Sequence, residues 1–300
     1  MPAMPRPYRF SPLRDGELVG LAAPASPFKL GAFKKGLDRL KQLGFRARYR
    51  QDLFSRQGYL AGSDRRRAEE LNRLFADPEV KVILAVRGGY GTARIIPHLD
   101  ERVIRTHPKL LVGYSDLTLL QLYLWQRFSV PSLHGPMLLP QLAFAPLSYL
   151  KKVVSFLQGE TGPIKIKPQH FLRKGTAEGV LVGGCLSLVV TTLGTPFEIE
   201  TKDSILFLED IGEKVYEIDR MLTHLKNAGK FKMVRGILIG RFADKAVRKM
   251  MTDFFSDFKG PIAYGLPFGH VSEPLLLPIG IRARLHLGKS GTLNFDRLFS

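Results

Sequence analysis

The segment KLLVGYSDLT, residues 109–118, decides the fold of the first half of the chain. Its apolar start predicts a short buried strand, and the apolar-periodic residues 117–128 predict a helix that begins at once. Ser115 therefore lies on a sharp strand-to-helix turn, where its hydroxyl stands clear of the backbone and the N–H groups of the new helix point toward it. That is the position of a nucleophile. Ser and Asp ahead of an apolar helix are also common capping residues, so the segment alone leaves both interpretations open.

The rest of the first 160 residues alternates between predicted strands and helices. Such alternation is typical of a doubly wound, mostly parallel sheet, whose functional loops lie at the carboxyl ends of the strands. The loop Arg87-Gly-Gly-Tyr-Gly91 and the Ser115 turn both follow predicted strands, so we expect them to be neighbours on one rim. The predicted strands are 18–23, 45–49, 80–86, 110–113 and 130–133, and the predicted helices are 30–43, 63–76, 117–128 and 146–158.

The pattern changes after residue 160. Residues 161–179 are polar, rich in lysine and interrupted by Pro and Gly, which predicts a linker between two domains. Residues 180–300 then show short strands and glycine turns with fewer helices, which predicts a smaller, β-rich and barrel-like β/α domain. Its predicted strands are 204–208, 234–239, 262–263, 281–287 and 292–295, and its predicted helices are 216–226 and 245–258.

Composition excludes several classes of protein. The 300 residues are 45% hydrophobic and 24% charged, as in a globular chain with a real core, and no apolar run approaches the roughly 18 residues of a membrane helix. Residues 1–11 lack the apolar segment of a secretory signal, so we expect a cytoplasmic location. A single cysteine, Cys185, excludes an internal disulfide or a cysteine-cluster metal site, and its apolar setting predicts a buried thiol.

The formal net charge of +18 permits an anionic partner, but it does not by itself predict nucleic-acid binding. The positive residues are scattered over predicted helices whose other faces are apolar, so we expect them on solvated faces. Examples are Lys34-Lys35, Arg65-Arg66-Arg67 and Lys151-Lys152. No nucleic-acid-binding motif accompanies them.

A serine nucleophile needs a base and an acid that orients the base. Two of the seven histidines are candidates for the base: His134, which ends a strand on the same rim as Ser115, and His270, in the rigid loop Gly-Leu-Pro-Phe-Gly-His. We expect the remaining histidines at the surface or on a strand of the second domain. Glu209 and Asp210 end a buried strand, where a carboxylate is costly unless it is paired.

Four motifs in order resemble the LD-carboxypeptidase family of serine peptidases, which includes the muramoyltetrapeptide carboxypeptidases and the microcin-C immunity peptidases. They are Arg87-Gly-Gly-Tyr-Gly, Gly113-Tyr-Ser-Asp, Leu208-Glu-Asp-Ile-Gly-Glu with Asp219-Arg220 after it, and Gly265-Leu-Pro-Phe-Gly-His. Each motif is weak alone, but their order and spacing extend the resemblance from about residue 18 to about residue 287.

The resemblance implies a triad that spans two domains, with Ser115 as nucleophile, His270 as base and Glu209 as orienting acid. Glu209 is preferred to Asp210 and Glu213 because the family's acid is the first carboxylate after that strand. The implied oxyanion donors are the backbone N–H groups of Gly89 and Asp116, with Gly88 as the alternative to Gly89. Arg87 and Tyr114 are candidate substrate-binding residues, and no metal or organic cofactor is implied.

The resemblance also implies the reaction: release of D-alanine from murein tetrapeptide during cytoplasmic wall recycling, by a homodimer. One alternative is a peptidase of the same family that acts on a peptide–nucleotide antibiotic, whose subgroup is expected to carry an aromatic insertion where residues 210–217 are short. Another is a non-catalytic α/β binding protein in which Ser115 only caps its helix. The chain departs from the family at Cys185, where Asn is usual, and this leaves the triad unchanged.

Overall fold

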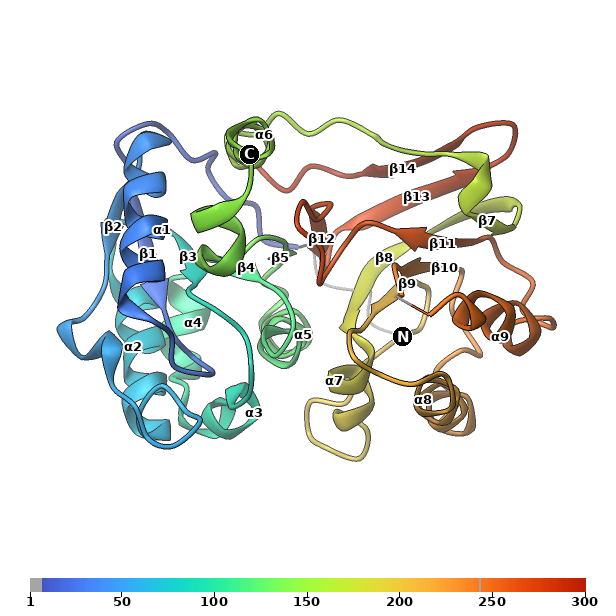
Figure 1. Ribbon diagram of the computed structural model, residues 1–300, viewed down its shortest axis with the longest axis horizontal. Helices are drawn as coiled ribbons and strands as arrows, with labels where there is room; N and C mark the ends of the chain where they lie inside the picture. Colours follow the sequence, from blue (N-terminus) through green and yellow to red (C-terminus); the bar gives the residue numbers. More distant parts are fainter. Residues whose placement is uncertain (1–6, 243) are drawn as a thin grey trace.

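The computed structural model describes residues 7–242 and 244–300, which form two sheets side by side (Figure 1). The first sheet has the order β12-β5-β4-β3-β1-β2, with five parallel strands and β12 antiparallel at one edge. Its strands are β1 (Leu18–Ala22), β2 (Arg46–Arg48), β3 (Val80–Ala85), β4 (Leu110–Gly113), β5 (Ser132–His134) and β12 (Leu277–Ile279). The predicted doubly wound α/β sheet is therefore confirmed.

Helices cover both faces of this sheet, because its central strands are buried on both sides and need cover. One face packs against α1 (Leu30–Gln42) and α6 (Leu147–Leu157). The other carries α2 (Asp64–Ala76), α3 (Thr92–Ile95), α4 (Glu101–Thr106) and α5 (Leu117–Phe128).

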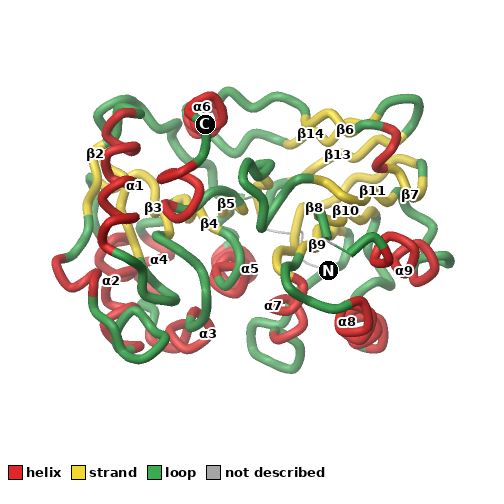
Figure 2. The backbone as a smooth tube through the Cα atoms, in the orientation of Figure 1, coloured by secondary structure: helices red, strands yellow, loops and turns green. Residues whose placement is uncertain are grey.

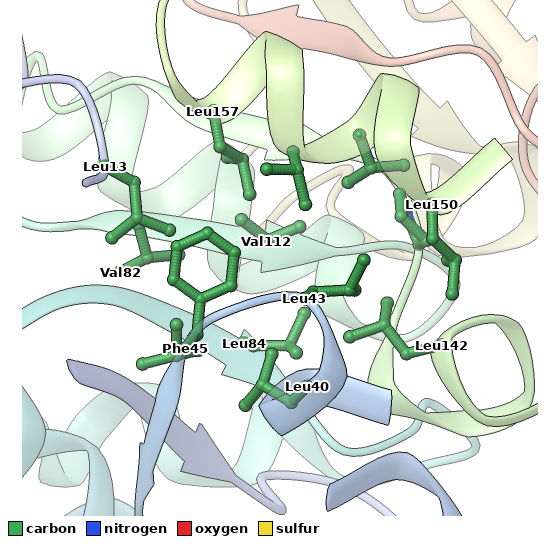
Figure 3. Close-up of a pocket in the computed structure, with 14 residues that line it drawn as sticks. Leu13, Leu40, Leu43, Phe45, Val82, Leu84, Val112, Leu142, Leu150 and Leu157 are labelled. Carbon is green, nitrogen blue, oxygen red and sulfur yellow. The ribbon is translucent and has the colours of Figure 1, made fainter. Parts of the chain in front are cut away.

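A cavity of about 30 Å³ lies between α1, α6 and the sheet (Figure 3). Its labelled side chains, among them Leu40, Leu84 and Leu157, point toward one another, and every residue that lines it is apolar. A void of this size could hold a water molecule only if polar groups were there to bind it. The cavity is therefore a packing feature of the core.

The second sheet has the order β6-β14-β13-β8-β9-β10-β11-β7 and is yellow on the right of Figure 2. Strands β8 to β11 are parallel, and the strands on either side of them are antiparallel. The elements are β6 (Ile164–Ile166), β7 (Phe171–Arg173), β8 (Gly175–Cys185), α7 (Leu186–Thr191), β9 (Ser204–Glu209), α8 (Val215–Asn227), β10 (Gly236–Gly240), α9 (Ala246–Phe254), β11 (Ile262–Leu266), β13 (Arg282–Leu287) and β14 (Gly291–Phe295). The predicted β-rich second unit is confirmed.

Residues 161–179 differ from the expected linker, because they contain β6, β7 and the first part of β8. The glycines of β8 suggest a loop, but they are required by close approach of the neighbouring strand. A Cβ on Gly179 would lie 2.6 Å from the carbonyl oxygen of Asp203, and one on Gly183 would lie 1.8 Å from that of Phe207. These glycines therefore mark tight strand packing.

Two features join the sheets. Strand β12 comes from the C-terminal part of the chain but pairs with β5, and Leu277 of β12 lies opposite His134 of β5. It therefore covers what would otherwise be an open edge of the first sheet. Helix α5 lies between the sheets, with every residue from Leu117 to Trp125 buried, as expected of a helix that is mostly apolar all round. The two halves consequently share a packed boundary.

Candidate active site

Ser115 lies where β4 turns into α5, and its backbone has φ +65°. This left-handed conformation is uncommon for a residue with a side chain and marks a sharp, strained turn. The first residues of α5 receive no side-chain cap, so Ser115 does not have the capping role that was the alternative to a nucleophile. Its hydroxyl is left available for chemistry.

His270 comes from the second half of the chain, in the loop that follows β11. Its Nε2 lies 3.2 Å from Oγ of Ser115. The preceding residue, Gly269, has φ +78°, a conformation that glycine adopts without strain and that turns the loop back toward β9. The ring of Tyr114 packs edge-on against the His270 ring at a centroid distance of 4.9 Å, which limits the orientations of the imidazole.

Glu209, the last residue of β9, is buried and holds the other side of the His270 ring. Its Oε2 lies 2.8 Å from Nδ1 of His270 and also accepts the backbone N–H of His270 at 3.2 Å. Burial would raise the pKa of Glu209, but the histidine rings on either side, His134 and His270, bring it down to about 2. Burial likewise lowers the pKa of His270, but the hydrogen bond and charge of Glu209 outweigh it, and the pKa is raised.

The other candidate acids and the other candidate base lie elsewhere. Asp210 accepts the backbone N–H groups of Ser187 and Ile211 rather than a hydrogen bond from His270. Glu213 is on the loop beyond it, where its neighbours are Asp210 and Glu217. His134 is fully buried, and its Nε2 faces Glu209, at 3.6 Å, rather than Ser115.

The glycine loop and the serine turn are neighbours, as predicted. A Cβ on Gly88 would lie 3.0 Å from Cβ of Ser115, so this loop approaches the serine as closely as bare backbone allows. Gly89 has φ +116° and packs against Ser26. Among the residues that the structure describes, no acceptor is found for the backbone N–H groups of Gly89 and Asp116, the residues that directly follow Gly88 and Ser115.

A cleft of about 740 Å³ opens at these residues. Arg87 and Lys29 are the exposed cations on its wall, and none of the described residues that line it is acidic. Tyr114 is buried at its base and its hydroxyl accepts a hydrogen bond from Gln141 at 2.8 Å. The cleft therefore favours an anionic ligand.

The expectation that Arg65-Arg66-Arg67 lie on a solvated face is wrong for two of the three. Arg65 is exposed, but Arg66 and Arg67 are buried. Arg66 pairs with the buried Glu70 at 2.5 Å. Arg67 donates hydrogen bonds to the carbonyl oxygens of Pro24 and Gly91, and so it ties the glycine loop to the segment that follows β1. Charge alone could not reveal this role, which depends on carbonyl groups far away in sequence.

The carboxylate of Asp116 accepts the backbone N–H of Thr92 at 2.8 Å rather than capping α5, so it also anchors the glycine loop. Cys185 is buried, as predicted, with its Sγ 3.5 Å from the carboxylate of Asp210. Burial raises the pKa of the Cys185 thiol, which keeps it protonated. Within residues 7–242 and 244–300, no cluster of three His, Cys, Asp or Glu side chains is arranged to hold a metal ion.

A hydroxyl, an imidazole and a buried carboxylate in contact in this order form the arrangement that serine hydrolases use. The comparison with known proteins is more specific. Residues 19–135 match the LD-carboxypeptidase N-terminal domain, and residues 178–285 match the LD-carboxypeptidase C-terminal domain. The chain belongs to the LD-carboxypeptidase family, and it is a serine-type carboxypeptidase.

Individual relatives support this assignment. The probable murein peptide carboxypeptidase of Bacillus subtilis is 38% identical over 292 residues, covering 93% of this chain and 92% of the relative. The murein tetrapeptide carboxypeptidase of Pseudomonas aeruginosa is 31% identical over 291 residues, covering 90% of this chain and 93% of its own length. The microcin C7 self-immunity protein MccF shares the fold, with a TM-score of 0.90 at 22% identity over 98% of this chain and 100% of that structure.

Proposed function

We propose that this protein hydrolyses the bond between an L-centre and a terminal D-amino acid, releasing D-alanine from murein tetrapeptide. The observation that carries the proposal is the alignment of Ser115, His270 and Glu209 through contacts of 3.2 and 2.8 Å. The substrate is suggested by two relatives whose names state murein peptide and murein tetrapeptide. Recycling of wall peptides in the cytoplasm by a homodimer completes the proposal.

Acylation begins when Nε2 of His270 takes the proton of the Ser115 hydroxyl and Oγ attacks the carbonyl carbon of the L-centre. The negative charge that forms on the carbonyl oxygen is held by the backbone N–H groups of Gly89 and Asp116. Each such donor is worth about 10²–10³ in rate, because it acts where water is excluded and needs no reorganisation. Glu209 stabilises the imidazolium that forms.

Collapse of the tetrahedral intermediate breaks the C–N bond, and His270 passes its proton to the nitrogen of the departing D-alanine. Water then attacks the ester that joins the peptide to Ser115, with His270 as the base. The Ser115 oxygen takes the proton back as it leaves, and the tripeptide product is released with a new carboxylate. The cycle needs no metal and no organic cofactor.

Recognition of the terminal carboxylate is assigned to the cations of the cleft. Arg87 is tied by one guanidinium nitrogen to the carbonyl oxygen of Pro27 at 3.1 Å, which leaves its other donors for a ligand. Lys29 lines the same cleft. Tyr114 also lines the cleft, and its ring packs against His270.

The peptide–nucleotide alternative is less well supported. The loop between β9 and α8 spans only residues 210–214, and the one large apolar side chain it presents to the cleft is Ile211, which is 60% exposed. This loop therefore lacks the aromatic insertion that is expected of the peptide–nucleotide subgroup. The likeness to MccF at 22% identity concerns the fold and does not favour this substrate.

The test is an assay of D-alanine release from purified murein tetrapeptide, with a peptide–nucleotide substrate and a tetrapeptide ending in L-alanine run beside it. We expect release from the D-alanine peptide alone. Preferential cleavage of the peptide–nucleotide would replace the proposed substrate while keeping the chemistry. No hydrolysis of any of the three would reject the proposal.

A further inference from the structure

The side chain of Glu209 is tightly enclosed, and its two carboxylate oxygens are the atoms that can form hydrogen bonds there. A Cβ on Gly269 would lie 2.1 Å from the Glu209 carboxylate, and a Cβ on Gly240 would lie 2.6 Å from its Cβ. Two glycines therefore allow the backbone to close around the side chain. A buried carboxylate oxygen that lacks a hydrogen bond is costly, so each oxygen of Glu209 needs a donor.

The two oxygens of Glu209 are not equally satisfied. Oε2 contacts both Nδ1 and the backbone N–H of His270. Oε1 is buried and has no hydrogen-bond partner in the part of the chain that the structure describes. The nearest charged or polar partner recorded for it is Nε2 of His134, at 3.6 Å, which is just beyond hydrogen-bond length. The imidazole nitrogens of His134 are themselves buried and without a partner among the described residues.

The side chain of His134 is surrounded by aromatic rings, so its ring nitrogens have few possible hydrogen-bond partners. The ring lies in a nest of aromatic side chains, with centroid distances of 5.1 Å to Phe207, 5.9 Å to Tyr114 and 6.3 Å to Phe268. Its backbone is fixed between β4 and β12, in register with Gly113 and Leu277. An apolar residue would fill such a nest at lower cost than an imidazole with no hydrogen bond.

We propose that His134 is a positioning residue for the reaction, which donates its Nε2–H to Oε1 of Glu209 and so fixes the plane of the carboxylate that orients His270. The inference rests on the proposed function of Ser115, His270 and Glu209. Hydrogen bonds of catalytic groups are often long in an unliganded site and shorten in the complex with substrate, and a closure of a few tenths of an ångström suffices here. His134 itself touches neither Ser115 nor the substrate cleft.

The physical effect is to hold the carboxylate from both sides. With only His270 as a partner, Glu209 could rotate about its side-chain bonds and offer either oxygen. A second N–H donor on Oε1 removes that freedom and compensates the buried charge. His270 then presents Nε2 to Ser115 in one orientation.

The experiment compares His134→Phe, which keeps a ring but removes the donor, with His134→Gln, whose amide can donate from a similar position. We expect His134→Phe to lower kcat about 10- to 100-fold, as for loss of a hydrogen bond to a charged group, with KM changed less than threefold. His134→Gln should recover at least a tenth of the wild-type kcat. Phe207→Leu is the matched control: it loosens the same nest without removing a polar group, so Tm should fall and kcat should stay within threefold.

Wild-type kcat in folded His134→Phe would overturn the proposal, and so would equal losses of kcat in His134→Phe and Phe207→Leu. If His134→Phe does not fold, NMR of the ¹⁵N-histidine-labelled wild-type protein decides, because it reports which nitrogen of His134 carries the proton. A proton on Nε2 supports the role, and a bare Nε2 overturns it. Ser115→Ala is assayed in parallel: activity there rejects the triad itself, whereas an inactive Ser115→Ala beside a fully active His134→Phe rejects only the role of His134.

Discussion

Nε2 of His270 lies 3.2 Å from Oγ of Ser115, although 155 positions separate the two residues in sequence and they follow strands of different sheets. The contact depends on the packing of the two sheets against each other through α5 and through β12, an edge strand of the first sheet that also packs against β8. The site is therefore a property of the assembled chain. Anything that shifts one sheet relative to the other should affect the rate before it affects the fold.

The strained backbone at Ser115 predicts an unusual order of stability. A residue with a side chain at φ +65° costs about 1–3 kcal/mol, and glycine avoids most of that cost. Because neither variant has a hydroxyl, Ser115→Gly should be more stable than Ser115→Ala by about 1 kcal/mol in urea unfolding. Ser155, inside α6, is the control, and there the alanine variant should be the more stable. A Ser115→Ala variant at least as stable as Ser115→Gly would show that Ser115 is not strained.

The pairing of Glu209 with His270 predicts how activity depends on pH. The pKa of His270 is raised by Glu209, and His270 must be neutral to act as a base, so kcat/KM should fall as the pH drops through that pKa. Glu209→Gln removes the negative charge, which lowers the pKa of His270 and moves the acid limb to lower pH. The same change should reduce kcat by about 10³–10⁴ because the imidazolium loses its counter-charge. The profile of kcat/KM across the acid and neutral range measures both effects.

Glu213→Gln is the control for this experiment, since Glu213 lies on the nearby loop and contacts neither His270 nor Ser115. Its acid limb should coincide with that of the wild type. An acid limb of Glu209→Gln at unchanged or higher pH would contradict the assignment of Glu209 as the partner of His270.

The enclosure of Glu209 predicts that Gly269 cannot carry a side chain. In Gly269→Ala the new Cβ would meet the Glu209 carboxylate at 2.1 Å, so the carboxylate must move away from His270, and kcat should fall about 100-fold or more. Gly212 has a similar φ, +89°, but a Cβ there would have no atom within 4 Å. Gly212→Ala should therefore lose only about 1 kcal/mol of stability and keep its activity. Equal activity of the two variants would show that the enclosure does not matter.

If the cations of the cleft bind the terminal carboxylate, removing one of them should weaken binding only of substrates that have a free C-terminus. Arg87→Ala should raise KM for murein tetrapeptide about tenfold, with a smaller change in kcat, because a charge-assisted contact to the terminal carboxylate is lost. The tetrapeptide with an amidated C-terminus has no such carboxylate, so its KM should be the same in wild type and variant. A rise in KM for both peptides would assign Arg87 to a general structural role. Lys29→Ala, compared in the same way, shows how the two cations share the contact.

Much of the fold could be predicted because its signals are local. One continuous segment contains both the strand that ends at Gly113 and the helix that begins at Leu117. The same alternation of strand and helix recurs along the first half of the chain, and it predicts the parallel sheet. The four motifs point to Ser115, Glu209 and His270 because each lies at a strand end or a rigid turn. The structure brings these three side chains together.

What could not be predicted depends on contacts between distant segments. In the sequence, the glycines of β8 indicate a loop. In the structure, they are needed because the backbone of β9 lies too close for a side chain at these positions. Arg67 looks like part of a charged surface until the carbonyl groups of Pro24 and Gly91 are seen around it. His134 resembles a base in the sequence because it shares a rim with Ser115, but its ring is fully buried and its Nε2 faces Glu209, 75 positions further along the chain.

The most direct test of the central claim is the rate of D-alanine release from murein tetrapeptide by Ser115→Ala, measured beside wild type on protein whose circular dichroism spectrum is unchanged. If Ser115 is the nucleophile, the variant should lose about 10⁴- to 10⁶-fold in kcat while it still binds the peptide. Release within about tenfold of the wild-type rate by the folded variant would contradict the account.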